Sequence, residues 1–81
     1  MARPYKNSSQ HSELIDFGKA VRSIRLDKGI SQEKLAELAG IDRSYMGGVE
    51  RGEHNVALIN MKRISNALDV SIAFIMKKSN L

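Results

Sequence analysis

Apolar residues recur at three- and four-residue steps along most of this 81-residue chain, which is the spacing of amphipathic helices. Capping residues and glycines divide the pattern into segments, because they favour the backbone found at helix ends. No segment shows the strict alternation of a strand, and no heptad persists. The sequence therefore predicts an all-α protein with five short helices, at about residues 13–28, 32–39, 43–51, 58–68 and 72–78.

Three of these helices have a clear apolar side. In the first helix it consists of Leu14, Phe17, Val21 and Ile24. In the second it consists of Leu35, Ala36, Leu38 and Ala39, and in the fourth of Leu58, Met61, Ile64, Ser65 and Leu68. We expect these side chains to form the core of the domain.

The fifth predicted helix is apolar almost all round before it reaches Lys77 and Lys78. A domain of this size cannot cover such a helix with its own core, so a partner subunit is its natural cover. We therefore expect a homodimer. The expected dimer-interface residues are Ile72, Phe74, Ile75 and Met76, and the pattern leaves open which of the four belong to the core instead.

Side chains that accept hydrogen bonds from free N–H groups mark where the helices begin. The expected caps of the first, second, third and fifth helices are Ser12, Ser31, Asp42 and Ser71. The fourth helix instead follows Val56 and Ala57, which predict a weaker cap.

Composition limits the class of protein. A chain of 81 residues with 42% hydrophobic residues forms one domain with a small core. Its 13 lysines and arginines exceed its 9 aspartates and glutamates, and the net charge of +4 favours a polyanionic partner. No apolar run has the length of a signal peptide or of a membrane span. We expect a soluble, cytoplasmic protein with no membrane partner, with a flexible arm at residues 1–11 and one domain at residues 12–81.

The sequence offers no set of residues for catalysis or metal binding. It lacks cysteine, which excludes disulfides and thiolate ligands. His11 and His54 have no further ligands at metal-binding spacing, and there is no strand that a phosphate-binding loop would follow. We therefore expect no enzyme and no bound metal or cofactor.

The second and third predicted helices, joined by a tight turn at Gly40, form the pattern of a helix–turn–helix. In that motif the second helix of the pair lies in the major groove of DNA. Gln32 follows the cap Ser31, where free N–H groups favour a phosphate. An ordinary exposed glutamine on a first turn is the alternative interpretation.

The third predicted helix opens with side chains suited to reading bases. Arginine pairs in a bidentate manner with guanine, which makes Arg43 a candidate, and Ser44 can take a base or a phosphate. Tyr45 offers a ring for a thymine methyl group or a hydroxyl for the backbone. A solvated helix start with a partly buried tyrosine is the alternative.

Two further features of the pair concern packing. Gly47 and Gly48 lie inside a helix, where each costs roughly 1 kcal/mol relative to alanine. Close approach is the usual compensation, so Gly47 could pack against the preceding helix and Gly48 could approach DNA; a bend or a frayed helix is the alternative. Arg25 and Glu50 each lie beside an apolar face, and we propose that they form a partly buried salt bridge rather than two independent exposed charges.

Taken together, these residues resemble the helix–turn–helix domain of the Xre and lambdoid-repressor family, over about residues 13–78. The resemblance is carried by Arg25, Gly29, Ile30, Ser31, Gln32, Leu35, Ala36, Gly40, Ile41, Val49, Glu50, Arg51, Gly52, Asn55, Ala67 and Leu68. Within that family, residues 41–55 are most similar to the controller proteins of restriction–modification systems, which are small homodimers that bind palindromic operators.

The resemblance implies a compact, five-helix, lambda-repressor-like fold and a role for each part. It places Arg43, Ser44 and Tyr45 at the bases and Arg25 with Glu50 in an internal ion pair. The residues expected at the phosphates are Ser31, Gln32, Arg51, His54 and Asn55, the last two through backbone N–H groups of their loop. The acidic residues near the recognition helix, Glu37 and Asp42, are candidate contacts with RNA polymerase if the protein activates transcription.

The sequence therefore predicts a homodimeric transcriptional regulator that binds double-stranded DNA in a sequence-specific way, as the controller of a restriction–modification operon. A phage-type repressor or a toxin–antitoxin regulator is the alternative of the same class. A protein-interaction module that uses the same fold without DNA, with the last helix as its docking surface, is the alternative of another class.

Overall fold

A computed structural model of the chain describes residues 11–81. They form five helices, α1 (Ser12–Asp27), α2 (Gln32–Ala39), α3 (Arg43–Glu50), α4 (Leu58–Leu68) and α5 (Ile72–Lys78). No strand occurs in this part of the chain, so the all-α, five-helix prediction is confirmed. Residues 1–10, which make up most of the expected N-terminal arm, lie outside the described residues.

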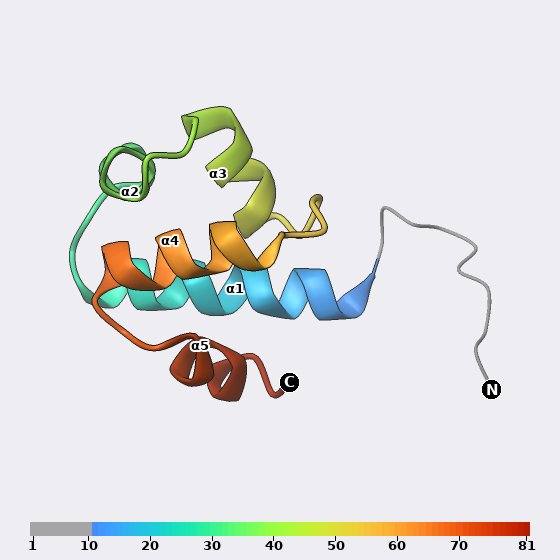
Figure 1. Cartoon of the computed structure of the whole chain (residues 1–81). Helices are drawn as coiled ribbons and strands as arrows, with labels where there is room; N and C mark the ends of the chain where they lie inside the picture. The colour runs from blue at the N-terminus through green and yellow to red at the C-terminus, as the bar shows by residue number, and fades with distance from the viewer. Residues whose placement is uncertain (1–10) are drawn as a thin grey trace, which may run out of the picture.

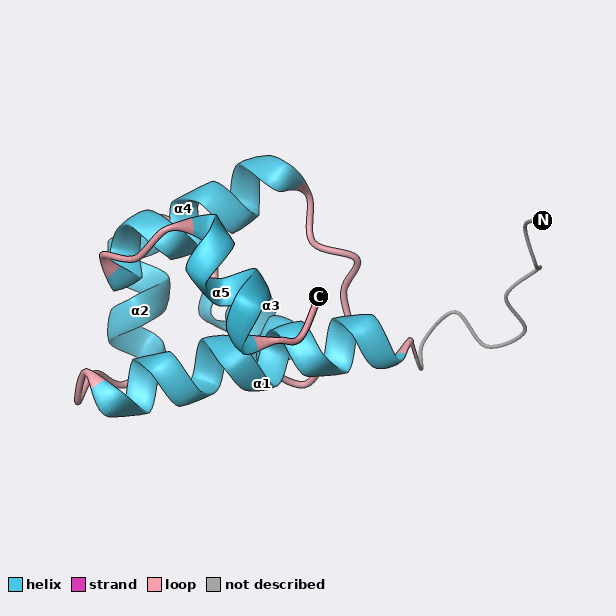
Figure 2. Cartoon of the chain, turned by 90° about the horizontal axis from the view of Figure 1, so that it is seen from below, coloured by secondary structure: helices cyan, strands magenta, loops and turns pink. Residues whose placement is uncertain are grey.

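The long helix α1 runs through the middle of the molecule, between the α2–α3 pair and α5 (Figure 1). Helices α2 and α3 lie on one side of it and pack against each other, while α5 packs against α1 and α4 on the opposite side. Figure 2 shows the molecule from below, with α5 in front. Helix α4 also packs on α2 and so joins the two sides of the bundle. The α2–α3 pair therefore occupies one face of the molecule.

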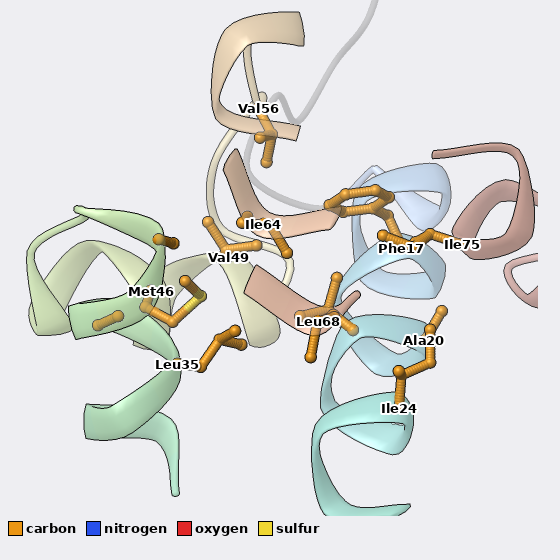
Figure 3. Close-up of a cluster of buried hydrophobic side chains, with 13 residues drawn as sticks. Phe17, Ala20, Ile24, Leu35, Met46, Val49, Val56, Ile64, Leu68 and Ile75 are labelled. Atoms are coloured by element: carbon orange, nitrogen blue, oxygen red, sulfur yellow. The ribbon is translucent and has the colours of Figure 1, made fainter. Parts of the chain in front are cut away.

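Apolar side chains from all five helices and from the α3–α4 loop meet in one buried core (Figure 3). The core includes three of the four residues of the α1 stripe, Phe17, Val21 and Ile24. Two expected core residues are exposed instead, Leu38 at 52% and Leu58 at 67%. Helix α2 buries only the sector that contains Leu35, Ala36 and Ala39, and Leu58 opens α4 at the edge of its stripe.

Local hydrogen bonds fix most of the helix ends as predicted. The side chains of Ser31, Asp42 and Ser71 cap α2, α3 and α5 by accepting from backbone N–H groups of their first turns. Gly40 ends α2 in the left-handed region, with φ of 68°. Helix α4 begins after Ala57, which gives no side-chain cap, in agreement with the weaker cap expected there.

The expected cap of α1 is wrong. Ser12 is the first residue within that helix, and the N-cap position is His11. The carbonyl oxygen of His11 accepts the first bonds of the helix, from the N–H groups of Leu14 at 3.1 Å and Ile15 at 3.2 Å. The helix therefore starts one residue earlier than the serine pattern indicated.

Two glycines let the end of α3 lie directly against α1. A methyl group on Gly18 would overlap the carbonyl oxygen of Val49 and would lie 2.6 Å from that of Glu50. Gly52 follows α3 with φ of +76°, and a methyl group there would lie 2.6 Å from Cα of Ile15. Both positions require a missing side chain, so backbone meets backbone at this crossing. The role of Gly18 was not predicted, because it depends on where α3 contacts α1 and not on a local pattern.

Candidate nucleic-acid interface

The ion pair predicted between Arg25 and Glu50 is present. Nε of Arg25 donates to Oε2 of Glu50 at 2.7 Å, and Nη2 donates to Oε1 at 3.0 Å. Nη1 donates to the carbonyl oxygen of Ile30 at 3.0 Å, and Nε2 of Gln32 donates to Oε1 of Glu50 at 3.0 Å. The two charged side chains are 9% and 2% exposed. This network ties α1, the first turn of α2 and the end of α3 into one unit.

The first turn of α3 presents Arg43 and Ser44 to solvent. Oδ2 of Asp42 accepts from the backbone N–H groups of Ser44 at 3.0 Å and Tyr45 at 3.4 Å, which fixes the start of the helix. The other face of α3 is buried, with Met46 fully inside the core. The helix is thus anchored along one face and free at its N-terminal side chains, as a recognition helix must be. Contact of Arg43 and Ser44 with bases stays a prediction.

Tyr45, the third expected base contact, is held by two other parts of the chain. Its ring stacks on the ring of His54, with centroids 4.5 Å apart and planes inclined by 14°. Its hydroxyl accepts from Nδ2 of Asn60, in α4, at 3.4 Å. Neither contact was predicted. They arise because the chain turns back after α3, where the N–H of Glu53 donates to the carbonyl oxygen of Gly48 at 2.9 Å.

The adjacent glycines of α3 each make room for a different side chain. A methyl group on Gly47 would lie 3.1 Å from Nη1 of Arg51 and 3.2 Å from Oε1 of Gln32. A methyl group on Gly48 would overlap the imidazole ring of His54. Helix α3 remains regular across both positions, so the bent or frayed helix is wrong. Gly47 lies beside Gln32 of the preceding helix, as expected, whereas the space at Gly48, expected to face DNA, is filled by His54. The groups that approach are residues expected at DNA phosphates.

Arg51 lies at the end of α3 and pairs with the carboxylate of Glu53. Nε of Arg51 donates to Oε2 at 2.7 Å and Nη2 donates to Oε1 at 3.2 Å, with both side chains largely exposed. Hydrogen bonding to Arg51 lowers the pKa of the Glu53 carboxyl below its ordinary value, and the same bond raises the pKa of Arg51. Arg51 therefore stays charged, and a phosphate must compete with a carboxylate for its guanidinium group.

The other expected contact residues, in α2 and its cap and in the α3–α4 loop, are at least partly exposed. The hydroxyl of Ser31 accepts from the N–H of Lys34 at 2.9 Å, so its first role is the cap of α2. Gln32 is half-buried, and Asn55 is exposed in the α3–α4 loop. The candidate polymerase contact Glu37 is exposed and accepts from Nζ of Lys34 at 3.3 Å. Their contacts with DNA or polymerase stay predictions.

Similarity to known proteins identifies the family of this helix–turn–helix domain. The profile of the helix-turn-helix family matches residues 21–75, which is most of the chain. The chain belongs to the Xre-type helix–turn–helix family. It is a DNA-binding transcription regulator, as the relatives that it matches are regulators and control proteins rather than enzymes.

Several of these relatives are control proteins of restriction–modification systems. The chain is 51% identical over 55 residues to the control protein C.BamHI of Bacillus amyloliquefaciens, covering 67% of this chain and 68% of that one. It is 41% identical over 61 residues to C.SmaI of Serratia marcescens, covering 75% and 73%. The crystal structure of the controller protein C.AhdI of Aeromonas hydrophila superposes with a TM-score of 0.79 at 48% identity, covering 80% of this chain and 98% of that one.

Helix α5 of this helix–turn–helix regulator differs from the prediction in one residue. Ile75 is fully buried in the core of its own chain, which corrects its assignment to a dimer interface. Met76 is partly buried and packs against the same core. Phe74 is 49% exposed, and Ile72 is half-buried. An interface on α5 therefore has Phe74 and Ile72 as its accessible apolar residues.

In residues 11–81 of the regulator, no helix is both long enough and apolar enough to cross a membrane. The same part of the chain contains no group of three or more histidines and carboxylates placed to hold a metal ion.

Proposed function

We propose that this regulator is a homodimeric controller of a restriction–modification operon, and that it binds a palindromic operator. The observation that carries the proposal is the capped, rigidly anchored α3, which exposes Arg43 and Ser44 in a chain 51% identical to a restriction–modification control protein over the matched region. The net charge of +4 favours the same partner.

In the proposed complex the first turn of α3 enters the major groove. Arg43 donates to a guanine, and Ser44 contacts a neighbouring base or phosphate. Gln32, at the N-terminus of α2, and Arg51 bind phosphate on the same side of the groove, because their side chains lie together beside Gly47. The backbone of the α3–α4 loop at His54 and Asn55 adds phosphate contacts. Arg25 and Glu50 hold these parts in register.

The proposed dimer places two copies of α3 on successive half-sites. Phe74 and Ile72 of α5 are the apolar residues available to its interface. Such a dimer matches a two-fold symmetric operator, since each subunit reads the same half-site sequence. At promoters that the protein activates, the exposed carboxylates of Glu37 and Asp42 are candidate contacts with RNA polymerase.

The test uses DNA from upstream of the protein's own gene and the variant Arg43→Ala. We expect the wild-type protein to retard this DNA at low salt and to prefer it to a copy whose inverted repeat is scrambled. Arg43→Ala should lose roughly 1–3 kcal/mol on the operator and relax the preference at one base pair in each half-site.

Arg22→Ala, which removes an exposed arginine from α1, is the matched control and should leave the preference unchanged. An equal loss of affinity by Arg43→Ala on all DNA would instead make Arg43 a phosphate contact. Failure of the wild-type protein to retard its own upstream DNA at low salt would contradict the proposal as a whole.

A further inference from the structure

His54 lies beside the recognition helix without being part of it. Its ring covers Gly48 of α3 and stacks face to face on Tyr45, one turn earlier in that helix. The Tyr45 hydroxyl is held from the other end by Asn60 of α4. Three consecutive segments, α3, the loop and α4, thus meet at one aromatic ring.

We infer that His54 is a positioning residue that sets the orientation in which Tyr45 is presented to the bases, and that Gly48 leaves the space that the His54 ring requires. This inference rests on the proposed function, because it assigns a role within the reading of the operator. The imidazole ring faces the protein under this assignment, and phosphate contact is left to the backbone N–H groups of His54 and Asn55.

The stacking geometry supports positioning. Nearly parallel rings at 4.5 Å are one of the favoured arrangements of aromatic pairs, and such pairs contribute beyond the area that they bury. Without this contact the Tyr45 ring would keep its packing against the edge of the core and the 3.4 Å bond at its hydroxyl, but it would lose the flat surface that fixes the orientation of its exposed face. The stack therefore removes alternative orientations of the Tyr45 ring before DNA is bound, and preorganised contacts discriminate better between base pairs.

The space at Gly48 supports the same role. The three atoms nearest to a methyl group built on Gly48 all belong to the His54 ring, and two of them overlap it. Any other residue at this position would push the ring away from α3. Glycine is unfavourable inside a helix, so Gly48 lowers the stability of α3. The space that it leaves is occupied by the His54 ring, which accounts for a glycine at this position.

The first test compares His54→Ala with His54→Phe, which keeps a flat ring for the stack but removes the ring nitrogens. Discrimination between the operator and single-base variants at the position read by Tyr45 should fall about two- to tenfold in His54→Ala. His54→Phe should restore most of that loss. Affinity for non-specific DNA and the salt dependence of binding should stay unchanged in both, as they should in the control Asn66→Gln, which changes an exposed polar residue of α4.

The opposite result is equally clear. A loss of affinity in both variants that is uniform over all sequences, with a salt slope reduced by about one, would make the imidazole a phosphate contact and overturn the inference.

The second test uses Gly48→Ala in two backgrounds. In the wild-type chain it should displace His54, lower the Tm and reduce discrimination as His54→Ala does. In the His54→Ala background no ring occupies the space over Gly48. Gly48→Ala should then raise the Tm through helix propensity and cause no further loss of discrimination. A drop in Tm of the same size in both backgrounds would show that Gly48 is needed for another contact. It would contradict the inference that Gly48 makes room for His54.

Nuclear magnetic resonance reports on the stack in the free protein. The ring protons of His54 should be shifted upfield by the Tyr45 ring and should lose that shift in Tyr45→Leu, with His11 as an internal reference. Unshifted His54 resonances would rule out the stack. If the wild-type protein discriminates no operator, the proposed function fails and the positioning role fails with it. The reversed effect of Gly48→Ala on the Tm would still appear, so the two failures are distinguishable.

Discussion

At the scale of single residues, the Arg25–Glu50 pair places two charges where water is nearly excluded, with side chains 9% and 2% exposed. Such a pair is tolerated because every strong donor and acceptor is bonded, including Gln32 to the same carboxylate. Removal of one partner leaves the other charge buried and unpaired. Arg25→Ala should therefore lower the free energy of unfolding by about 3–5 kcal/mol.

Urea denaturation followed by circular dichroism measures this loss. Lys28→Ala, which truncates an exposed residue just after α1, is the control and should change stability by less than about 0.5 kcal/mol. The double variant Arg25→Met/Glu50→Leu replaces the pair by apolar side chains and should recover most of the loss. A double variant no more stable than Arg25→Ala would contradict the explanation from an unpaired buried charge.

Single residues also show what the sequence can and cannot predict. The caps Ser31, Asp42 and Ser71 were predictable because each bond spans only a few residues of one turn. The Arg25–Glu50 pair was predictable from two charges that border apolar faces. The Tyr45–His54 stack was not, because it depends on the direction in which the chain leaves α3. That direction is fixed by the turn at Gly52 and by its contact with α1. The glycine marks a helix end in the sequence, but the contact with α1 has no local signal.

At the scale of elements, α5 separates the roles of neighbouring apolar residues. Its composition indicated a helix that the domain could not cover, and the bundle does cover one side of it, through Ile75. A hydrophobic pattern gives the period of a helix but not the side that its neighbours will reach. In a helix of seven residues that is apolar almost all round, the pattern does not assign core and interface.

The same helix yields a prediction from two neighbouring residues. Ile75→Ala removes a fully buried side chain and should destabilise the fold by about 2–5 kcal/mol in urea unfolding. Phe74→Ala removes a side chain that is 49% exposed, so its cost to the folded monomer should be much smaller. In sedimentation equilibrium, Phe74→Ala should shift the protein toward monomer at concentrations where the wild type is a dimer. A wild-type protein that is monomeric at micromolar concentration, with and without DNA, would remove the dimer from the proposal.

At the scale of the whole molecule, the described residues span 40 × 25 × 20 Å, with a radius of gyration of 12.4 Å. Two such bodies joined through α5 would present their α3 helices at one fixed separation. Adjacent major grooves on one face of DNA lie about 34 Å apart, which a dimer of domains this size can bridge. A rigid dimer should therefore accept one spacing of half-sites and reject others.

Operators with altered centres test that rigidity. Insertion of five base pairs turns the second half-site to the far side of the DNA, so affinity should fall to that of a single half-site, a loss of about 10²-fold or more. Insertion of ten base pairs restores the face but adds about 34 Å between the half-sites, nearly the full length of one subunit. We therefore expect that the insertion of ten base pairs does not restore the affinity. Gel-shift titration measures both, and recovery at ten base pairs would mean that the two α3 helices are not held by one compact interface through α5.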